Sequence, residues 1–468
     1  MQKVTFGLIF GNRNFFPDKL VENARREMIQ LLENEGFEIV TLSEKDTKLG
    51  AVETWQDAKK CADLFKKNGD KIDGIIVTLP NFGDERGVAD SIRFSGLDVP
   101  VLIHAYPDNL NKFDPENRRD SFCGKISVCN NLVQYNIPFT LTTSHTVDPK
   151  SEEFKSDLRK FAGICRVVKG MRNVRVGAIG TRPNAFNTVR YSEKILEDYG
   201  ISVQTIDLSE IFGLMNKLSD EDSKVVEKLE EIKSYINING VPDKSLRKIA
   251  KFGIIVDDWI KENDIVATAI QCWTSIQQNM GIMPCTIMSM LSNSFIPSAC
   301  EVDITGALSM YALQLASQSP SAIVDWNNNY GDNPDKTVLF HCSNFPVSLM
   351  EDPKMGYGDI ISGTVGVENA YGTCVGKIKK GPLTFARLTT DDSYGVMRAY
   401  VGEGEITDET LNTFGGYGVA KINDLQKLLK FICQNGFEHH VAINLSKTAE
   451  ILSEAFTKYL GIDTYLHS

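Results

Sequence analysis

The sequence predicts an α/β protein with two parallel-sheet α/β domains followed by a β-rich, barrel-like C-terminal domain with helices. Strands alternate with helices through the first two thirds of the chain, several strands are apolar throughout, and glycine-broken β segments fill the last third. The first two features are typical of parallel sheets with right-handed crossovers. A chain of 468 residues is also too long for one ordinary core. We therefore expect domains at residues 1–168, 169–333 and 334–468.

The first domain is predicted from regular alternation of strand and helix patterns. Val4–Phe10 is a β-rich run that ends at Gly11, and Asp18–Glu35 places apolar residues at helical spacing. The remaining elements expected here are a strand at Glu38–Leu42, a helix at Ala51–Asn68, and buried strands at Asp73–Pro80 and Val99–His104.

A second α/β domain is predicted to open near Gly170. Its expected elements are strands at Val174–Gly180, Ser202–Ile206 and Asp264–Ile270, a helix at Phe186–Tyr199, and two helices between Asp220 and Asn263. The glycines of Val174–Gly180 form neither GxGxxG nor a Walker A motif, so we interpret them as a tight turn and expect no dinucleotide cofactor.

The sequence pattern changes after about Pro334, where short β segments are broken by glycines. Glycines become frequent, and a barrel-like β domain is expected. Its predicted elements are strands at Thr337–His341, Val375–Ile378 and Thr384–Leu388, a helix at Lys421–Asn435 before His439 and His440, and a closing stretch at Leu445–Leu460.

Composition excludes several classes of protein. The formal net charge of -11 argues against a nucleic-acid partner, because phosphate binding needs a basic surface. The ten cysteines contain no CxxC, and the N-terminus shows no signal-peptide pattern, so we expect a cytoplasmic protein with reduced thiols. No apolar run is long enough to cross a bilayer, so no membrane partner is expected.

Three ionisable residues each end a buried-looking run. Glu301 follows a small apolar stretch, Asp325 follows Ala322-Ile-Val, and His341 follows Val338-Leu-Phe. Parallel strands present functional groups at their carboxyl ends, where we place Asp325. Carboxylates with an imidazole suit a divalent ion such as Mn²⁺.

The residues leave simpler interpretations open. An acid at the end of a strand is often a helix N-cap or an ion-pair partner, and His341 can be a hydrogen-bonded core histidine. Adjacent residues of a strand point to opposite faces, so at most one of His439 and His440 should face a given site.

At these residues the sequence resembles the L-fucose isomerase and L-arabinose isomerase superfamily. The matching pieces, in order, are Gln271-Cys-Trp273, Cys300-Glu301-Val-Asp303, Asp325-Trp326-Asn327, His341-Cys342-Ser-Asn344 and Glu438-His439-His440. The resemblance implies an aldose–ketose isomerase that binds Mn²⁺ or another divalent cation. It implies that Glu301 and Asp325 are both metal ligands and the acid–base pair, and that His440 is a third ligand, with His439 as the alternative.

The resemblance also implies a homohexamer in which the N-terminal domain of a neighbouring subunit offers Arg13 to the sugar. The alternative for Arg13 is a cation of a surface loop. Aromatic faces stack on sugars, so Trp273 and Trp326 are candidate pocket walls, with core packing as the alternative. The predicted substrate contacts are Arg13, Gln271, Trp273, Trp326, Asn327, His341 and His439. Arg182 and His104 are further candidates, and an arginine in the pocket would favour an anionic, sulfoquinovose-like sugar.

The predicted reaction passes through a cis-enediol, with proton transfer by the two carboxylates. Two other classes of protein stay open. A metal-dependent sugar lyase or aldolase would use the same site, but it would cleave a carbon–carbon bond. A non-catalytic sugar-binding protein would bind its ligand tightly without turnover, whether or not a chelator is present.

Overall fold

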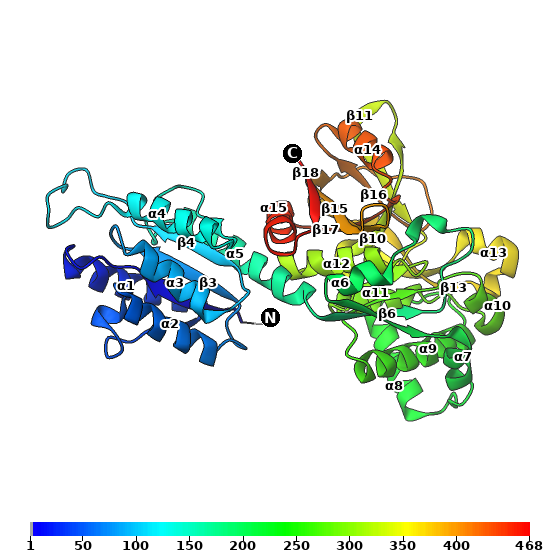
Figure 1. Cartoon of the computed structure of the whole chain (residues 1–468). Helices are drawn as coiled ribbons and strands as arrows, with labels where there is room; N and C mark the ends of the chain where they lie inside the picture. The colour runs from blue at the N-terminus through cyan, green and yellow to red at the C-terminus, as the bar shows by residue number, and fades with distance from the viewer. Residues whose placement is uncertain (1–2) are drawn as a thin grey trace. The chain divides into compact units, whose positions relative to one another are not determined.

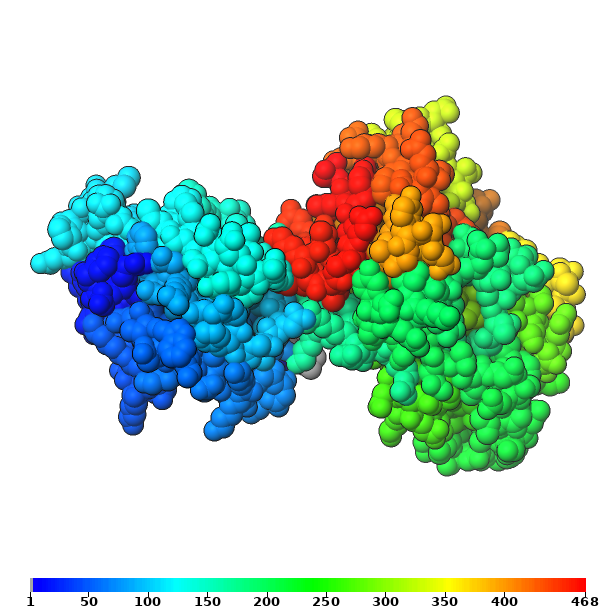
Figure 2. All heavy atoms as spheres, in the orientation of Figure 1, coloured from blue at the N-terminus to red at the C-terminus, as the bar shows by residue number. Residues whose placement is uncertain are grey.

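The computed structural model describes residues 3–468 and divides into two compact units (Figure 1). Unit 1 contains the residues up to Lys169 together with Glu454–Gly461, and unit 2 contains Gly170–Ser453 and Ile462–Ser468. The surface of unit 1 is formed mostly by the first third of the chain, blue to cyan in Figure 2. Within the described residues, no helix is long and apolar enough to cross a membrane.

Unit 1 is a three-layer α/β/α unit around a parallel sheet in the order β2-β1-β3-β4-β5. Its strands are β1 (Thr5–Phe10), β2 (Glu38–Val40), β3 (Gly74–Leu79), β4 (Val101–Ala105) and β5 (Thr140–Leu141). Its helices are α1 (Asp18–Asn34), α2 (Trp55–Lys67), α3 (Glu85–Ser95), α4 (Ser121–Gln134) and α5 (Glu152–Met171). Alternate residues of β1 pack against α1 and α5 on one face and against α2 and α3 on the other. Burial on both faces explains why these strands are apolar throughout.

Unit 2 begins with a parallel sheet in the order β7-β6-β8-β9. Its strands are β6 (Val174–Ile179), β7 (Ile201–Ile206), β8 (Ala267–Ile270) and β9 (Ser298–Cys300). The helices of this part are α6 (Glu193–Asp198), α7 (Leu208–Met215), α8 (Ser223–Tyr235), α9 (Asp243–Glu262), α10 (Ser275–Met280), α11 (Cys285–Asn293) and α12 (Ile304–Ser317). The predicted helix at Phe186–Tyr199 is wrong in its first half, where Asn187, Thr188 and Val189 are poor helix formers and form only a 3-10 turn.

The rest of unit 2 is a large mixed sheet that closes on itself. Its strands are β10 (Ala322–Tyr330), β11 (Asn333–His341), β12 (Met350–Tyr357), β13 (Tyr371–Ile378), β14 (Gly381–Asp391), β15 (Val396–Ile406), β16 (Gly416–Lys421), β17 (His440–Asn444) and β18 (Asp463–His467). Its helices are α13 (Asp359–Val365), α14 (Leu425–Gln434) and α15 (Ala449–Glu454). Pairing of β15 with β16 closes the strands β16-β11-β10-β17-β14-β15 into a barrel.

The predicted fold class is therefore confirmed. Two parallel sheets are followed by a β-rich barrel with helices. The barrel already begins with β10 at Ala322, ahead of the predicted domain boundary at residue 334. Division of residues 170–468 into two domains stays a prediction.

Candidate active site

Glu301 stands at the carboxyl end of β9, where the chain leaves the parallel sheet. The φ angles of 56° at Glu301 and 57° at Val302 lie in the left-handed region, which costs non-glycine residues about 1–2 kcal/mol each. The turn ends at Asp303, whose carboxylate accepts a 2.9 Å hydrogen bond from the Gly306 amide and caps α12. Asp303 is thus the N-cap of α12, and the Glu301 carboxylate takes no part in capping this helix.

Asp325 and His440 are paired neighbours on two antiparallel barrel strands. Asp325 of β10 lies opposite His440, the first residue of β17. The sequence argument that put Asp325 at the end of a parallel strand is wrong, because β10 continues to Tyr330 and both of its neighbours are antiparallel. The Asp325 carboxylate reaches the site because the register between β10 and β17 pairs Asp325 with His440.

Three side-chain atoms of Glu301, Asp325 and His440 converge. His440 Nε2 lies 3.6 Å from Glu301 Oε2 and 3.5 Å from Asp325 Oδ1. All three atoms are buried, and none has a hydrogen-bond partner within residues 3–468. Because buried polar atoms are nearly always paired, three unpaired atoms that face one another indicate a ligand that they share.

Two further histidines flank this group. His341 ends β11, and its Nε2 lies 3.7 Å from Glu301 Oε2. His439 Nε2 lies 3.5 Å from Asp325 Oδ1, the same atom that faces His440. The expectation that only one of the adjacent histidines faces the site is wrong, since His439 precedes β17 and does not follow its alternation. Each carboxylate is therefore flanked by two imidazoles.

The second oxygen of Glu301 is anchored by the segment after β8. Trp273 Nε1 donates to Glu301 Oε1 at 2.8 Å, and Cys272 Sγ donates to it at 3.2 Å. Burial acts to raise the pKa of Glu301, but interactions with His341 and His440 outweigh burial and hold this pKa below its usual value. An ionised carboxylate with one fixed oxygen thus presents its other oxygen to the site.

Behind His440 lies a fully buried ion network that the sequence argument missed. Asp303 Oδ2 accepts a hydrogen bond from His440 Nδ1 at 2.9 Å, and Arg387 Nη2 donates to Asp303 Oδ1 at 2.9 Å. Arg387 Nε also donates to Glu438 Oε2 at 3.1 Å. With its proton on Nδ1, His440 keeps the Nε2 lone pair toward Glu301 and Asp325, as a metal ligand requires.

Charged neighbours set the protonation of Asp303 and of His341. Burial opposes ionisation of Asp303, but Arg387 and His440 hold its pKa far below the usual range. Burial also opposes protonation of His341, but Cys342 and Glu301 raise its pKa well above the ordinary value.

The loop between β6 and α6 covers the site with an aromatic ring. The Phe186 ring centroid lies 5.2 Å from that of His439, 5.4 Å from that of His440 and 6.0 Å from that of Trp273. Gln271 Oε1 accepts the Thr181 amide at 2.9 Å and so ties the start of this loop to the end of β8. Of the predicted contacts, Trp273 therefore lies at Glu301, whereas the Gln271 side chain binds the start of the loop.

The remaining predicted residues of unit 2 lie elsewhere. Trp326 donates from Nε1 to the buried Tyr400 hydroxyl at 2.9 Å and packs edge-on against buried Phe385. These contacts support core packing, the alternative interpretation of Trp326, and its role as a sugar contact stays a prediction. Asn327 is exposed on the bulge of β10, and no hydrogen bond joins its side chain to the site within residues 3–468.

The two predicted contacts of unit 1, Arg13 and His104, both have partners within that unit. Arg13 is half-buried, donates from Nε to Gly83 O at 2.8 Å and forms an ion pair with Glu85. His104 is fully buried between Thr78 Oγ1 at 2.7 Å and Val147 O at 2.9 Å, and burial lowers its pKa to about 3. Both ring nitrogens of His104 are occupied, so its prediction as a substrate contact is wrong.

Comparison with known families agrees with this architecture. Residues 7–172 match the N-terminal domain of the fucose/sulfoquinovose isomerase family, and residues 339–467 match the C-terminal domain of L-fucose isomerase. The chain is a member of the fucose isomerase-like family. Fucose isomerases are aldose–ketose isomerases, so the prediction of an enzyme of this class is confirmed.

The chain is also similar in sequence to individual sulfoquinovose isomerases. The chain is 22% identical over 351 residues to a sulfoquinovose isomerase of Priestia aryabhattai, which covers 75% of both chains. It is 25% identical over 206 residues to a sulfoquinovose isomerase of Alkalicoccus urumqiensis, which covers 44% of this chain and 46% of the relative.

The donor set fits the metal that is general in this fucose isomerase-like family. Glu301, His341 and His440 offer ligand atoms within 4.8 Å of one another, and so do Asp325, His439 and His440. Around an octahedral ion with ligands about 2.1 Å away, neighbouring ligand atoms lie roughly 3 Å apart. The separations of 3.5–3.7 Å at Glu301, Asp325 and the histidines need only a small contraction.

The sequence does contain features that point to Asp303, Arg387 and Glu438. Asp303 and Glu438 lie inside two of the matching motif pieces, and Arg387 is a lone charge in the apolar run Thr384–Leu388. A charge in a buried strand needs partners of opposite sign, which Asp303 and Glu438 supply.

Proposed function

We propose that the chain is a divalent-metal-dependent aldose–ketose isomerase that acts on an anionic, sulfonated hexose through a cis-enediol. The carrying observation is the convergence of three buried, unpaired atoms, Glu301 Oε2, Asp325 Oδ1 and His440 Nε2. Family membership gives this arrangement its reaction class.

Glu301, Asp325 and His440 would hold the ion, with His341 and His439 flanking it. Carboxylate oxygens with one imidazole suit Mn²⁺, which prefers hard ligands and accepts nitrogen. When bound, such an ion polarises the C1 and C2 oxygens of the sugar and acidifies the proton on C2.

The two carboxylates would move the protons. One removes the C2 proton and returns it to C1, while the other transfers a proton between O2 and O1. The Asp325 side chain is 24% exposed and the Glu301 side chain 5% exposed, so Asp325 is the better placed to reach a sugar carbon. Glu301, anchored by Trp273, keeps a fixed orientation toward the ion.

Arg182 is our candidate for contact with the sulfonate. It follows Thr181 in the loop that carries Phe186, is half-buried, and forms no ion pair within residues 3–468. A guanidinium matches the oxygens of a sulfonate in charge and geometry. The names of the sulfoquinovose isomerase relatives support the same substrate class.

We also propose that the protein is cytoplasmic and assembles as a homohexamer in which a neighbouring subunit completes the pocket. Arg13 follows the carboxyl end of β1 and is oriented by its ion pair with Glu85. It would be the residue offered to that pocket. Light scattering of the purified protein tests the assembly, and a monomer with full turnover would contradict it.

The reaction is tested by adding sulfoquinovose or L-fucose to the Mn²⁺-loaded enzyme in D₂O and following ketose formation by NMR. We expect ketose formation, and strong loss of turnover in Glu301→Gln and Asp325→Asn, but not in Glu405→Gln, an exposed barrel acid. Near-normal turnover by either folded, metal-loaded site variant would sink the assignment. Carbon–carbon cleavage would indicate a lyase, and tight binding without turnover a sugar-binding protein.

A further inference from the structure

A cluster of thiols lies against Glu301 and supplies neither a metal ligand nor a proton in the proposed reaction. The sulfurs of Cys285, Cys300 and Cys342 lie within 4.8 Å of one another, and Cys272, Cys300 and a Glu301 oxygen form a second group within the same limit. All four cysteines are free. We call these four residues the thiol cluster.

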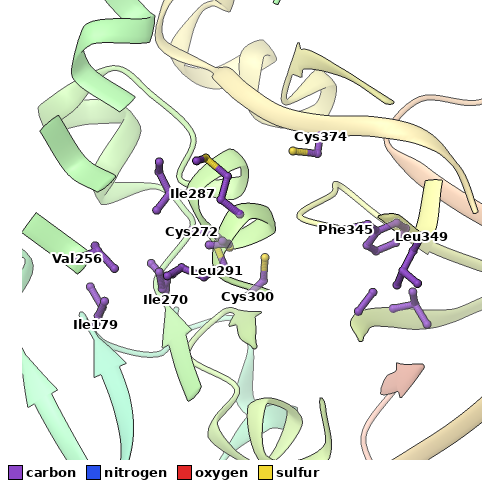
Figure 3. Close-up of a cluster of buried hydrophobic side chains, with 14 of the residues drawn as sticks. Ile179, Val256, Ile270, Cys272, Ile287, Leu291, Cys300, Phe345, Leu349 and Cys374 are labelled. Atoms are coloured by element: carbon purple, nitrogen blue, oxygen red, sulfur yellow. The ribbon is translucent and has the colours of Figure 1, made fainter. Parts of the chain in front are cut away.

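The thiol cluster is assembled from separate elements of unit 2. Cys272 follows β8, Cys285 begins α11, Cys300 ends β9, and Cys342 follows β11. Figure 3 shows Cys272 and Cys300 close together among aliphatic side chains, while Cys374 lies apart from them. Packing alone needs no convergence of sulfurs from distant parts of the chain.

We propose that the thiol cluster is a second metal site, which takes a thiophilic ion such as Zn²⁺, Cd²⁺ or Cu⁺. Thiolates select such ions over the hard ions that carboxylates prefer. A tetrahedral ion with sulfur ligands about 2.3 Å away places those sulfurs roughly 3.8 Å apart, so the cluster of Cys285, Cys300 and Cys342, within 4.8 Å, needs a movement of less than a bond length. Each thiol that binds releases one proton to solvent.

Half-buried Cys342 provides the entry, while Cys272, Cys285 and Cys300 are buried and form the interior of the site. Cys272 and Cys300 pack within the apolar core, where a cation neutralises the thiolates that bind it. Cys342 Sγ lies 3.4 Å from His341 Nδ1, on the side of the cluster that faces the site. Hard ions gain little from sulfur ligands, so Mn²⁺ stays with Glu301, Asp325 and His440.

Occupancy of the thiol cluster would inhibit the isomerase, and this part rests on the proposed function. Cys300 precedes Glu301 in the chain and Cys342 follows His341, so drawing the sulfurs together displaces both neighbours. Binding through Cys272 also removes the S–H group that donates to Glu301 Oε1 at 3.2 Å.

The binding part is tested by titrating the full chain with Cd²⁺ and following the ultraviolet absorption of thiolate–cadmium bonds. The background carries Cys123→Ser and Cys433→Ser, which remove the two exposed thiols. We expect one Cd²⁺ per chain, with affinity lowered on the order of tenfold or more by Cys285→Ser. Cys374→Ser is the matched buried control and leaves the absorption unchanged.

Cys342→Ser gives the same test if Cys285→Ser does not fold. Unchanged cadmium absorption and affinity in the folded variants would overturn the site. The inhibition part is tested by adding one equivalent of Cd²⁺ to the Mn²⁺-loaded enzyme, where we expect loss of turnover that Cys285→Ser prevents. Equal inhibition of both proteins would mean that Cd²⁺ acts at the carboxylates, which overturns the inhibition. Failure of the proposed isomerisation is seen separately, because the absorption titration needs no turnover.

Discussion

Asp303→Asn removes one charge from the network behind His440 while keeping the shape of the side chain. The Asp303 carboxylate accepts from Arg387, from His440 Nδ1 at 2.9 Å and from the Gly306 amide at 2.9 Å. An amide can keep the helix cap, but its NH₂ group then faces the donors of Arg387 or His440. Arg387 is fully buried and, among the described residues, keeps only Glu438 as an ionic partner.

The magnitudes follow from these contacts. Breaking a buried ion pair from one side costs about 3–5 kcal/mol of folding stability. Losing the partner that orients a metal-binding histidine weakens metal binding about 10–100-fold, which is about 1.4–2.8 kcal/mol. We therefore expect a destabilised but folded variant whose affinity for Mn²⁺ is lowered by that factor.

Free Mn²⁺, measured by electron paramagnetic resonance during titration, gives the metal affinity, and urea unfolding gives the stability. Asp157→Asn is the matched control, because Asp157 is a buried acid of unit 1 that binds only Thr143 in the described residues. It should lower stability and leave Mn²⁺ affinity unchanged. An affinity of folded Asp303→Asn within twofold of the parent, about 0.4 kcal/mol, would refute the positioning role.

His104 has a folded pKa of about 3, whereas an unfolded histidine has about 6.5; the unfolded state therefore binds the extra proton on acidification, and stability falls with pH below about 6.5. Urea unfolding at pH 7 and pH 5 should show a loss about 2 kcal/mol larger for the parent than for His104→Gln, and equal losses would contradict the burial argument. Phe186→Ala should lower kcat/KM about tenfold, because its contacts with His439, His440 and Trp273 are lost; exposed Phe295→Ala is the control in the same kinetic assay. Arg182→Gln should raise KM for sulfoquinovose far more than for a neutral aldose, and equal changes for the two sugars would exclude a sulfonate contact. EDTA should abolish turnover and lower the melting temperature, and Mn²⁺ at 100 times its Kd should restore about 2.7 kcal/mol of stability; turnover that survives chelation would contradict metal dependence.

Much of the fold could be predicted because many of its strands are recognisable from local sequence as short apolar runs. The buried strands of unit 1 are apolar on both faces, so β1, β3 and β4 stand out from the helices between them. The strand β18 was missed, because Asp463–His467 is a polar edge strand with one partner, β15. The loop at Phe186 was mistaken for a helix, because local spacing does not register the tertiary contacts that hold it.

The candidate site was predicted less completely, and the reason is geometric. The order of motifs found Glu301, Asp325 and the histidines, but the barrel register that sets Asp325 opposite His440 is a long-range property. Asp303 and Arg387 are distant in sequence, and only the folded chain shows that they form one ion pair.

The short segment Glu454–Gly461 has a consequence for biosynthesis. It belongs to unit 1, where the Tyr459 hydroxyl lies 2.9 Å from Thr140 Oγ1. A ribosome releases the first 169 residues of unit 1 early, but this segment emerges only after nearly all of unit 2. The nascent N-terminal unit must therefore wait with part of its surface uncovered, exposed to chaperones and proteases.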